Sequence, residues 1–410
     1  MDKPMQGVRI LEVAQFTFVP AAAAVLSDWG AEVIKVEHAV TGDAQRGLVS
    51  VLGLDVGGDG GSFYPIMEGP NRGKRSIGLA LDKPESRPVL EELIRRSDVF
   101  LTNYLPGARA KLGIDVEDVR RINPDIIYVR GSGFGTRGDE ADKGGYDSTA
   151  FWARAGSAAH VTPPDAPQMA HMPAGAYGDS IGGITIAGGI SAALFARART
   201  GETSIVDVSL LGVGAWAMQF AVNLAMVAGG PLPESVFPRH GAARNPLSGT
   251  YKTSDARWLM LTMLQPGRYW PEFCTVIERP DLIADPRFDT VEKLMSNAPQ
   301  AGEIIAEVLR TRTFVEWIKL FDGMSGPWAA VQDAWEVSQD RSLRANGLIS
   351  KVTDFDGRER ELLTSPVQFD ETPQQLTRAP QFAEHTDEVL AELGISMEEA
   401  IQLKIAGAVT

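Results

Sequence analysis

Residues 7–37 read GVRILEVAQFTFVPAAAAVLSDWGAEVIKVE, and this stretch decides the fold. The apolar run Gly7–Ala14 predicts a buried strand, and the run Ala31–Glu37 predicts a second one. Between them, Pro20–Trp29 predicts a helix, because proline suits a first helical turn and Gly30 suits the position just after the last turn. A strand–helix–strand unit of this length joins parallel strands, so the sequence predicts a parallel sheet.

Strand and helix patterns continue to alternate as far as residue 209. The predicted strands are residues 75–81, 98–102 and 125–129, and residues 200–209 predict a turn followed by a further strand. The predicted helices between them are residues 85–96 and 116–122. This alternation predicts an α/β fold with helices on both faces of the sheet.

The composition changes after residue 230, where a Pro- and Arg-bearing linker begins. A hairpin is predicted over residues 250–263, helices over 271–277, 300–309 and 313–320, strands over 347–352 and 359–364, and terminal helices over 384–394 and 397–403. We therefore predict a large domain at residues 1–230, a smaller α/β domain at 231–334, and a return to the large domain at 335–410.

The overall composition excludes several classes of protein. The 410 residues include 39 basic and 53 acidic side chains, and this net charge of −14 argues against non-specific nucleic-acid binding. Cys274 is the single cysteine, so an intramolecular disulfide is impossible. The start of the chain has no apolar signal core, and we expect a cytoplasmic protein. Residues 208–233 carry no charge, and we expect them to form a buried or interface helix, with no membrane span.

The loops that follow the strands are the expected place for function in an open parallel sheet. The first of them, Gln15–Pro20, contains no glycine, so the dinucleotide-binding fingerprint is absent where it would be required. Residues 131–146 contain six glycines, which suggests a mobile loop or one that a ligand approaches closely. Lys111, Arg137 and Lys143 are nearby cations that either meet phosphates or form ordinary solvated surface.

A single acid, Asp179, lies among the glycines of residues 174–190, at the start of a long apolar run that predicts a buried helix. One interpretation makes Asp179 the helix N-cap, since aspartate is a preferred capping residue. The other makes it an ionised nucleophile, because the N-terminal end of a helix stabilises a carboxylate and a carboxylate can form covalent intermediates. Small residues in this helix also predict close approach of another backbone.

In these features the chain resembles the class III coenzyme A transferases, the CaiB/BaiF family, along nearly its whole length. The matching motifs are Gly7–Glu12, Leu26–Glu37, Thr41–Asp43, Asn71–Ile77, Asn103–Gly107, Ile122–Pro124, Gly145–Asp147, Gly178–Ser180, Arg199–Gly201, Asp285–Phe288 and Glu384–Leu390. The resemblance implies a Rossmann-like large domain, a small domain, and a C-terminal return. It also implies a homodimer of two interlocked, ring-like chains.

The resemblance further implies chemistry at Asp179, which matches the family's catalytic aspartate. Its carboxylate would attack an acyl-CoA thioester and pass through anhydride and enzyme-bound CoA thioester intermediates before a second acid receives the CoA. The substrates would be an acyl-CoA and a carboxylic acid, with no tightly bound cofactor and no metal.

The family's CoA contacts carry over to particular positions of this sequence. They are Thr17, Phe18, His38, Leu79, Asn103, Tyr104, Lys111, Lys143 and Tyr146. His38 stands where some relatives have arginine, and Lys143 adjoins Gly144, which replaces a basic residue of some relatives. The segment Arg239–Asn245 lacks the glycine run of formyl-CoA transferase. Phe16, Phe151, Trp152 and Met169 either line an apolar acyl pocket or belong to the core.

Two alternatives remain open at this point. The α-methylacyl-CoA racemases share the fold and the aspartate, but their Gly-His-Asp motif reads Gly145-Tyr146-Asp147 here. Tyrosine ordinarily titrates near ~10 and is a poor base near neutrality. His160 and His171 are close in sequence, and each suits a structural or surface role. The second alternative is a catalytically idle CoA-binding protein.

Overall fold

The structure is a computed structural model that describes residues 3–51, 53–55, 63–232 and 244–410. Its contacts divide the chain into two compact units. The larger unit comprises Met1–Thr162, Gln168–Asn223 and Arg341–Thr410, and the smaller unit comprises Pro163–Pro167 and Leu224–Asp340.

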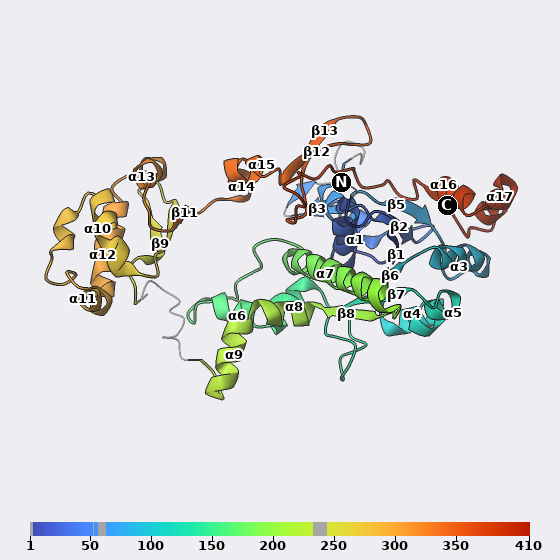
Figure 1. Cartoon of the computed structure of the whole chain (residues 1–410), viewed down its shortest axis with the longest axis horizontal. Helices are drawn as coiled ribbons and strands as arrows, with labels where there is room; N and C mark the ends of the chain where they lie inside the picture. The colour runs from blue at the N-terminus through green and yellow to red at the C-terminus, as the bar shows by residue number, and fades with distance from the viewer. Residues whose placement is uncertain (1–2, 52, 56–62, 233–243) are drawn as a thin grey trace. The chain divides into compact units, whose positions relative to one another are not determined.

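A six-stranded parallel sheet forms the centre of the larger unit (Figure 1). Its strands stand in the order β5–β2–β1–β6–β7–β8, and every neighbouring pair is parallel. They are β1 (Arg9–Val13), β2 (Glu32–Glu37), β5 (Arg75–Gly78), β6 (Val99–Thr102), β7 (Ile127–Ser132) and β8 (Ile205–Ser209). The six predicted strands and their parallel pairing are therefore confirmed.

The strands bury side chains on both faces, as parallel sheets do. Ile10 and Val99 belong to one apolar core, and the next residues along each strand, Leu11 and Phe100, belong to another. The helices that supply these two cores are α1 (Phe18–Asp28) and α7 (Tyr177–Thr200) for the first, and α3 (Arg87–Arg95), α5 (Val116–Ile122) and α16 (Thr386–Glu392) for the second. Helices on both faces confirm the α/β prediction.

Helices α1 and α7 lie against each other at two glycines. A Cβ atom added to Gly182 would come 2.3 Å from Cε2 of Phe18, and one added to Gly183 would come 2.6 Å from Cβ of Ala21. Both distances are far shorter than a van der Waals contact, so only glycine fits. The predicted close approach at this helix is confirmed.

The uncharged stretch, which the sequence predicts as one buried or interface helix, is broken in the structure. It forms α8 (Leu210–Ala217) and α9 (Gln219–Ala228), which meet at an angle of 76°. Gly214 presses α8 onto the backbone of Phe151, whereas α9 has no buried residue in this chain. The prediction of one continuous helix is therefore wrong, and the interface role of this stretch stays a prediction. By length and composition alone, α7 and the bent α8–α9 pair are long enough to cross a membrane, a test that apolar core helices also pass.

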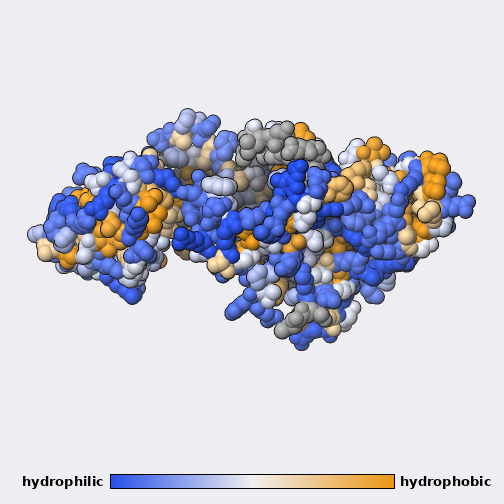
Figure 2. Space-filling view, turned by 90° about the horizontal axis from the view of Figure 1, so that it is seen from above, coloured by the Kyte–Doolittle hydropathy of each residue, from blue (hydrophilic) through white to orange (hydrophobic). Residues whose placement is uncertain are grey.

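Shorter elements complete the larger unit, and several of them carry no clear sequence signal. They are α2 (Pro65–Asn71), α4 (Pro106–Leu112), α6 (Ser157–Val161), α15 (Arg341–Ala345), α17 (Met397–Ile405), the hairpins β3 (Ser50–Val51)–β4 (Leu54–Asp55) and β12 (Ile349–Thr353)–β13 (Glu359–Leu363), the 3-10 turns η1 (Ala44–Gly47) and η2 (Pro84–Ser86), and the π-helix η3 (Asp147–Arg154). Figure 2 shows hydrophilic residues over most of the visible surface, with apolar residues scattered among them.

The smaller unit has its own core around a three-stranded antiparallel sheet in the order β11–β10–β9. Its elements are β9 (Ser248–Lys252), β10 (Trp258–Thr262), α10 (Pro266–Val276), η5 (Pro280–Ile283), α11 (Val291–Ser296), α12 (Ala298–Leu309), α13 (Phe314–Phe321), β11 (Trp328–Ala330) and α14 (Ala334–Ser338). The predicted hairpin is confirmed, with Ala256 in the left-handed conformation at its turn (φ 63°). Helix α10 begins five residues earlier than predicted, because Pro266 suits a first turn.

Candidate active site

Asp179 is the third residue of α7, and it is half-buried. The N-cap position belongs to Ala176, which adopts the left-handed conformation with φ 59°. No side chain caps the helix from that position. The capping interpretation of Asp179 is therefore wrong, and its carboxylate is available for another role beside the first turn of the helix.

The environment of Asp179 raises the pKa of its carboxyl to about 7, first through burial and second through the nearby charge of Asp147. The N-terminal end of α7 favours the ionised form, but burial outweighs it here. The sequence suggests a carboxylate kept ionised by the helix, whereas burial in the structure brings the pKa of this carboxyl close to neutral pH. A raised pKa of this kind is common at functional sites.

Asp147 is buried at the first position of the π-helix η3. Its Oδ1 accepts a hydrogen bond of 2.7 Å from the backbone N–H of Ser148. Burial raises the pKa of Asp147, and the free N–H groups of Ala176, Tyr177 and Gly178 at the start of α7 lower it in part. None of these groups makes a well-formed hydrogen bond to Oδ2, which has no partner among the residues that the structure describes. Sequence reasoning named Asp147 only as part of a motif and missed this position against α7.

A cavity of about 690 Å³ lies at the carboxyl ends of the parallel strands and includes Asp179 in its wall. Ligands bind at this edge in open α/β sheets. The wall is built from the first βα turn, the residues after β6, the end of β7 and the glycine-rich loop. Its lining residues include Gln15, Phe16, Phe18, Asn103, Tyr104, Arg109, Arg130, Gly131, Gly133, Gly144, Gly145 and Tyr146.

Four of the predicted CoA-contact residues share this cavity with Asp179. They are Phe18, Asn103, Tyr104 and Tyr146. The amide of Asn103 holds the first βα turn in place, since its Oδ1 accepts from the N–H of Gln15 at 3.1 Å and its Nδ2 donates to the carbonyl of Gln15 at 2.7 Å. The ring of Tyr146 meets Phe16 edge to face, with 6.0 Å between ring centroids.

The other five predicted contact residues are not part of the wall of this cavity. Thr17 donates a hydrogen bond of 3.0 Å to Oε1 of Gln45, and Lys143 pairs with Glu140 at 3.1 Å. His38 and Leu79 follow β2 and β5 at the same edge of the sheet, where Nδ1 of His38 accepts from backbone N–H groups and Leu79 is fully buried. Lys111 is exposed on α4. Their contacts with CoA stay predictions.

Two arginines of the cavity wall were missed by sequence reasoning. Arg109 donates to the carbonyl of Tyr104 at 2.7 Å, and Arg130 forms two bonds of 2.7 and 3.0 Å with Asp207. The Asp207 carboxylate is the main cause that raises the pKa of Arg130. Neither arginine belongs to a sequence motif. Arg109 lies on α4 and Arg130 on β7, and only the fold brings these two elements to one cavity.

The four residues considered for an acyl pocket lie in three different places. Phe16 lines the Asp179 cavity, and Phe151 belongs to the apolar core. Trp152 and Met169 line a second cavity of about 400 Å³, together with His171. The segment that starts at Arg239 lies outside the described residues as far as residue 243.

Known proteins resemble this chain over its full length. A model of CoA-transferase family III matches residues 5–386. The (R)-2-hydroxy-4-methylpentanoate CoA-transferase of Clostridioides difficile is 30% identical over 401 residues, which cover 98% of each chain. The formyl-CoA:oxalate CoA-transferase of Streptomyces avermitilis is 32% identical over 431 residues, which cover 100% of each chain.

A solved structure agrees with these sequence matches. The CaiB/BaiF family protein from Brucella suis superposes with a TM-score of 0.80 at 25% sequence identity, covering 96% of this chain and 100% of that one. Its match supports the mixed α/β architecture with the six-stranded parallel sheet. The chain therefore belongs to CoA-transferase family III, and it is a class III CoA-transferase.

Proposed function

We propose that this enzyme transfers CoA from an acyl-CoA to a free carboxylic acid, with Asp179 as the covalent nucleophile. The observation that carries the proposal is the position of the Asp179 carboxylate in the wall of a 690 Å³ cavity at the carboxyl edge of the sheet. The resemblance to CoA-transferases along the whole chain supports the same reaction class.

The proposed reaction balances without an energy source. A carboxylate oxygen of Asp179 attacks the thioester carbonyl, the C–S bond breaks, and CoA leaves as a thiolate with a mixed anhydride behind it. The thiolate attacks the aspartyl carbonyl and releases the first acid as its carboxylate, which leaves an aspartyl–CoA thioester. The second carboxylate attacks that thioester, and the expelled thiolate attacks the new acyl carbonyl, which regenerates Asp179.

The protein contributes position and charge to these steps. The nucleophile is the ionised form of Asp179, so the pKa of about 7 makes the first step depend on pH near neutrality. Backbone N–H groups of the glycine-rich loops are suited to stabilise the tetrahedral oxyanions. Gly133 and Gly145 lie against each other in the wall, where a Cβ on Gly133 would come 2.8 Å from Cα of Gly145. Any larger residue at Gly133 would force these loops apart.

The site favours CoA transfer over racemisation. A racemase needs a second acid–base group on the far side of the α-carbon, and no histidine lines the described wall of the Asp179 cavity. His171 lines the separate cavity instead. We therefore retain acyl-CoA and a carboxylic acid as the two substrates.

The relatives' names mention different acids, among them 2-hydroxy-4-methylpentanoate and oxalate. For this chain we propose CoA as a substrate, without a tightly bound cofactor, in a cytoplasmic enzyme. We also propose that two copies interlock as a homodimer. Exposed apolar side chains support this assembly, since Trp216 on α8 is 71% exposed and Val227 on α9 is 87% exposed. Helix α9 has no buried residue in this chain, and apolar side chains exposed together on one helix are typical of an interaction surface.

Intact-protein mass spectrometry after mixing with a panel of acyl-CoAs tests the covalent route. Wild type should gain a CoA- or acyl-sized adduct with at least one donor, and Asp179→Asn, which has nearly the same shape, should gain none. Ser180→Ala is the matched control, because Ser180 is the exposed neighbour whose hydroxyl only donates to the carbonyl of Ala176. Exchange of the α-proton into deuterated water without any adduct would instead support a racemase.

A further inference from the structure

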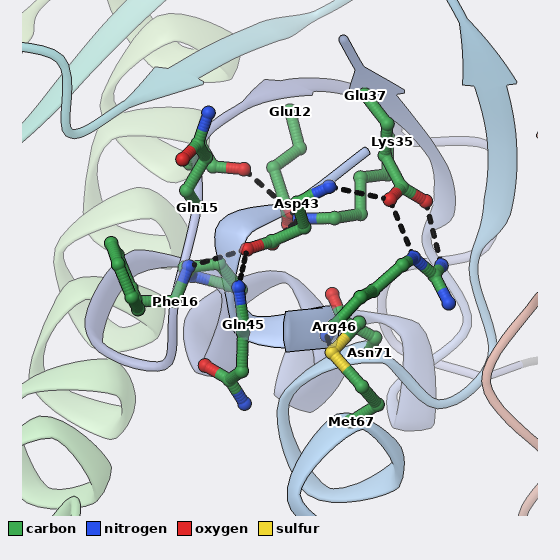
Figure 3. Close-up of polar contacts among 12 residues, drawn as sticks. Glu12, Gln15, Phe16, Lys35, Glu37, Asp43, Gln45, Arg46, Met67 and Asn71 are labelled. Atoms are coloured by element: carbon green, nitrogen blue, oxygen red, sulfur yellow. Dashed lines mark hydrogen bonds and ion pairs between the residues drawn. The ribbon is translucent and has the colours of Figure 1, made fainter. Parts of the chain in front are cut away.

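A group of charged side chains is buried beneath the first βα turn (Figure 3). Nζ of Lys35 lies 2.8 Å from Oε1 of Glu12 and 2.8 Å from Oδ2 of Asp43, and Nζ of Lys74 lies 2.6 Å from Oε2 of Glu12. All four residues are at most 4% exposed. We call Glu12, Lys35, Asp43 and Lys74 the buried charge cluster.

Such a cluster is a poor source of net stability, because each charge loses its hydration when it is buried. The effect is visible in the pKa of Lys74, which burial lowers to about 7 despite the Glu12 carboxylate. For Lys35 burial also acts to lower the pKa, but the carboxylates of Glu12, Asp43 and Glu37 outweigh it and raise the value. Because the buried charge cluster adds little net stability, its presence needs an explanation other than stability.

The cluster binds the backbone at three points between the end of β1 and the first turn of α1. Lys35 donates to the carbonyl of Ala14 at 2.9 Å, and Lys74 donates to the carbonyl of Pro20, inside α1, at 2.9 Å. Between them, Oδ1 of Asp43 accepts a hydrogen bond of 3.1 Å from the N–H of Phe16. The start and the middle of the turn, and the helix that follows it, are therefore bound to buried charges.

Phe16 has an unusual conformation at the middle point, with φ 64° in the left-handed region. An aromatic residue rarely adopts this conformation unless its surroundings impose it. The result is that the Phe16 ring lies in the wall of the Asp179 cavity, 6.0 Å from the Tyr146 ring.

The same turn also reaches the helix that carries Asp179. Phe18, two residues beyond Phe16, packs on Gly182 of α7 so closely that a Cβ there would come 2.3 Å from its ring. Gly182 lies three residues after Asp179, so both are on one face of the helix. The turn and the start of α1 therefore contribute Phe16 and Phe18 to the wall of the cavity that includes Asp179.

We propose that Asp43 is a positioning residue: held by Lys35, it keeps Phe16 in the left-handed conformation and so fixes the aromatic wall of the cavity in which Asp179 reacts. This inference rests on the proposed function. Asp43 also caps the 3-10 turn η1, where its Oδ1 accepts from the N–H of Gln45 at 2.9 Å. The competing explanation is that Asp43 only stabilises this local turn.

The test compares variants by their rate of adduct formation in a single turnover. Asp43→Asn removes the charge by which Lys35 holds this side chain at 2.8 Å, so the amide no longer keeps its oxygen against the N–H of Phe16. The variant should stay folded, bind CoA within about threefold of wild type, and form the Asp179 adduct at least about tenfold more slowly. Asp28→Asn is the matched control. Asp28 is also buried and paired, with Arg72 at 2.6 Å, but it does not touch the turn. Its adduct rate should stay within about twofold of wild type.

A second comparison separates positioning from capping. Glycine adopts the left-handed conformation without help, so adding Asp43→Asn to a Phe16→Gly background should slow the adduct step no further. Equal slowing in both backgrounds would mean that Asp43 acts by another route and would overturn the proposal, as would an unchanged rate in Asp43→Asn alone.

Two further measurements cover the remaining outcomes. If Asp43→Asn does not fold, Phe16→Ile and Phe16→Gly are compared instead. Both variants lack the aromatic ring, but isoleucine resists a positive φ. Slower adduct formation in Phe16→Ile than in Phe16→Gly supports the proposal, and equal rates overturn it.

If wild type forms no adduct with any donor, the proposed function fails. The crystal structure of Asp43→Asn then decides the positioning role separately, since Phe16 should leave the left-handed region if Asp43 holds it there, and retention overturns the inference.

Discussion

Asp147 faces the start of the helix that carries Asp179, and its charge adds to burial in raising the pKa of the Asp179 carboxyl to about 7. Two acids from distant parts of the chain thus form one electrostatic unit beside the cavity. When two carboxyls lie close together, ionising one makes it harder to ionise the other. This relationship leads directly to the first three predictions.

The rate of adduct formation should rise with pH through about 7 and level off above about pH 8. The reason is that only the ionised Asp179 carboxylate attacks the thioester, and its pKa is about 7. Single-turnover rates at saturating acyl-CoA between pH 5.5 and 9 measure this curve. A flat profile over that range would contradict the assignment of Asp179 as the group that controls the first step.

Asp179→Asn should increase the stability of the protein at pH 8. Folding raises the pKa of the Asp179 carboxyl to about 7, so this group favours the folded state only while it is protonated. The favourable contribution is complete below the pKa of the unfolded state and is lost as the pH rises through about 7. Asparagine carries no charge and avoids the cost of ionisation at pH 8. After discounting for partial exposure, the gain at pH 8 should be about 1–3 kcal/mol. Urea unfolding at pH 8 and pH 5 measures it, and the gain should be smaller at pH 5.

Asp147→Asn should move the pH profile of adduct formation toward lower pH. Removing the neighbouring charge lowers the pKa of Asp179, while the asparagine side chain still accepts from the N–H of Ser148. Glu140→Gln is the control, since this half-exposed acid of the glycine-rich loop pairs with Lys143 and Arg154. A profile that stays in place in Asp147→Asn would show that the two acids are not coupled.

Gly182→Ala should destabilise the protein by about 1–3 kcal/mol, because the added methyl group meets the Phe18 ring at 2.3 Å. Gly188 lies on the same helix with nothing within 4 Å of an added Cβ. Gly188→Ala should instead stabilise by about 0.5–1 kcal/mol through helix propensity. Urea titrations compare the two variants. Equal effects would mean that the contact between α1 and α7 is not as tight as described.

Aspartate substitutions at Met226 and Val227 should weaken the proposed homodimer. These side chains are 67% and 87% exposed on α9, and burying a charge in their place in an interface is costly. Val315→Asp is the control, because Val315 is also an exposed apolar residue, at 58%, but lies on a different helix, α13. Analytical ultracentrifugation should show a dimer for wild type and the control and a shift toward monomer for the α9 variants. Unchanged dimers would place the interface elsewhere.

Several features of the fold could be predicted because their signals are local. Strands β1 and β2 and helix α1 follow from apolar runs, Pro20 and Gly30, all within one stretch of the chain. The length of the connection then requires parallel strands. The family resemblance identified Asp179 as the candidate catalytic residue in the same way, from short motifs that stand in order along the sequence.

The start of α7 could not be predicted, because no residue next to it provides the cap. Ala176 adopts the left-handed conformation, and the acid that faces the free N–H groups is Asp147, about thirty residues earlier in the chain. The break between α8 and α9 was also missed. Gly214 packs α8 on the backbone of Phe151, a contact that an uncharged sequence does not reveal.

The sequence by itself determined the α/β class, the parallel sheet and the family, since these depend on periodicity, turn residues and ordered motifs. Only the tertiary structure decided the chemistry around Asp179: the pKa of about 7, the two arginines of the cavity, and the buried charge cluster under Phe16. Glu12 and Lys74 are 62 positions apart, yet their side chains meet at 2.6 Å. Burial and charge pairing depend on such distant contacts, and a sequence pattern records only neighbours along the chain.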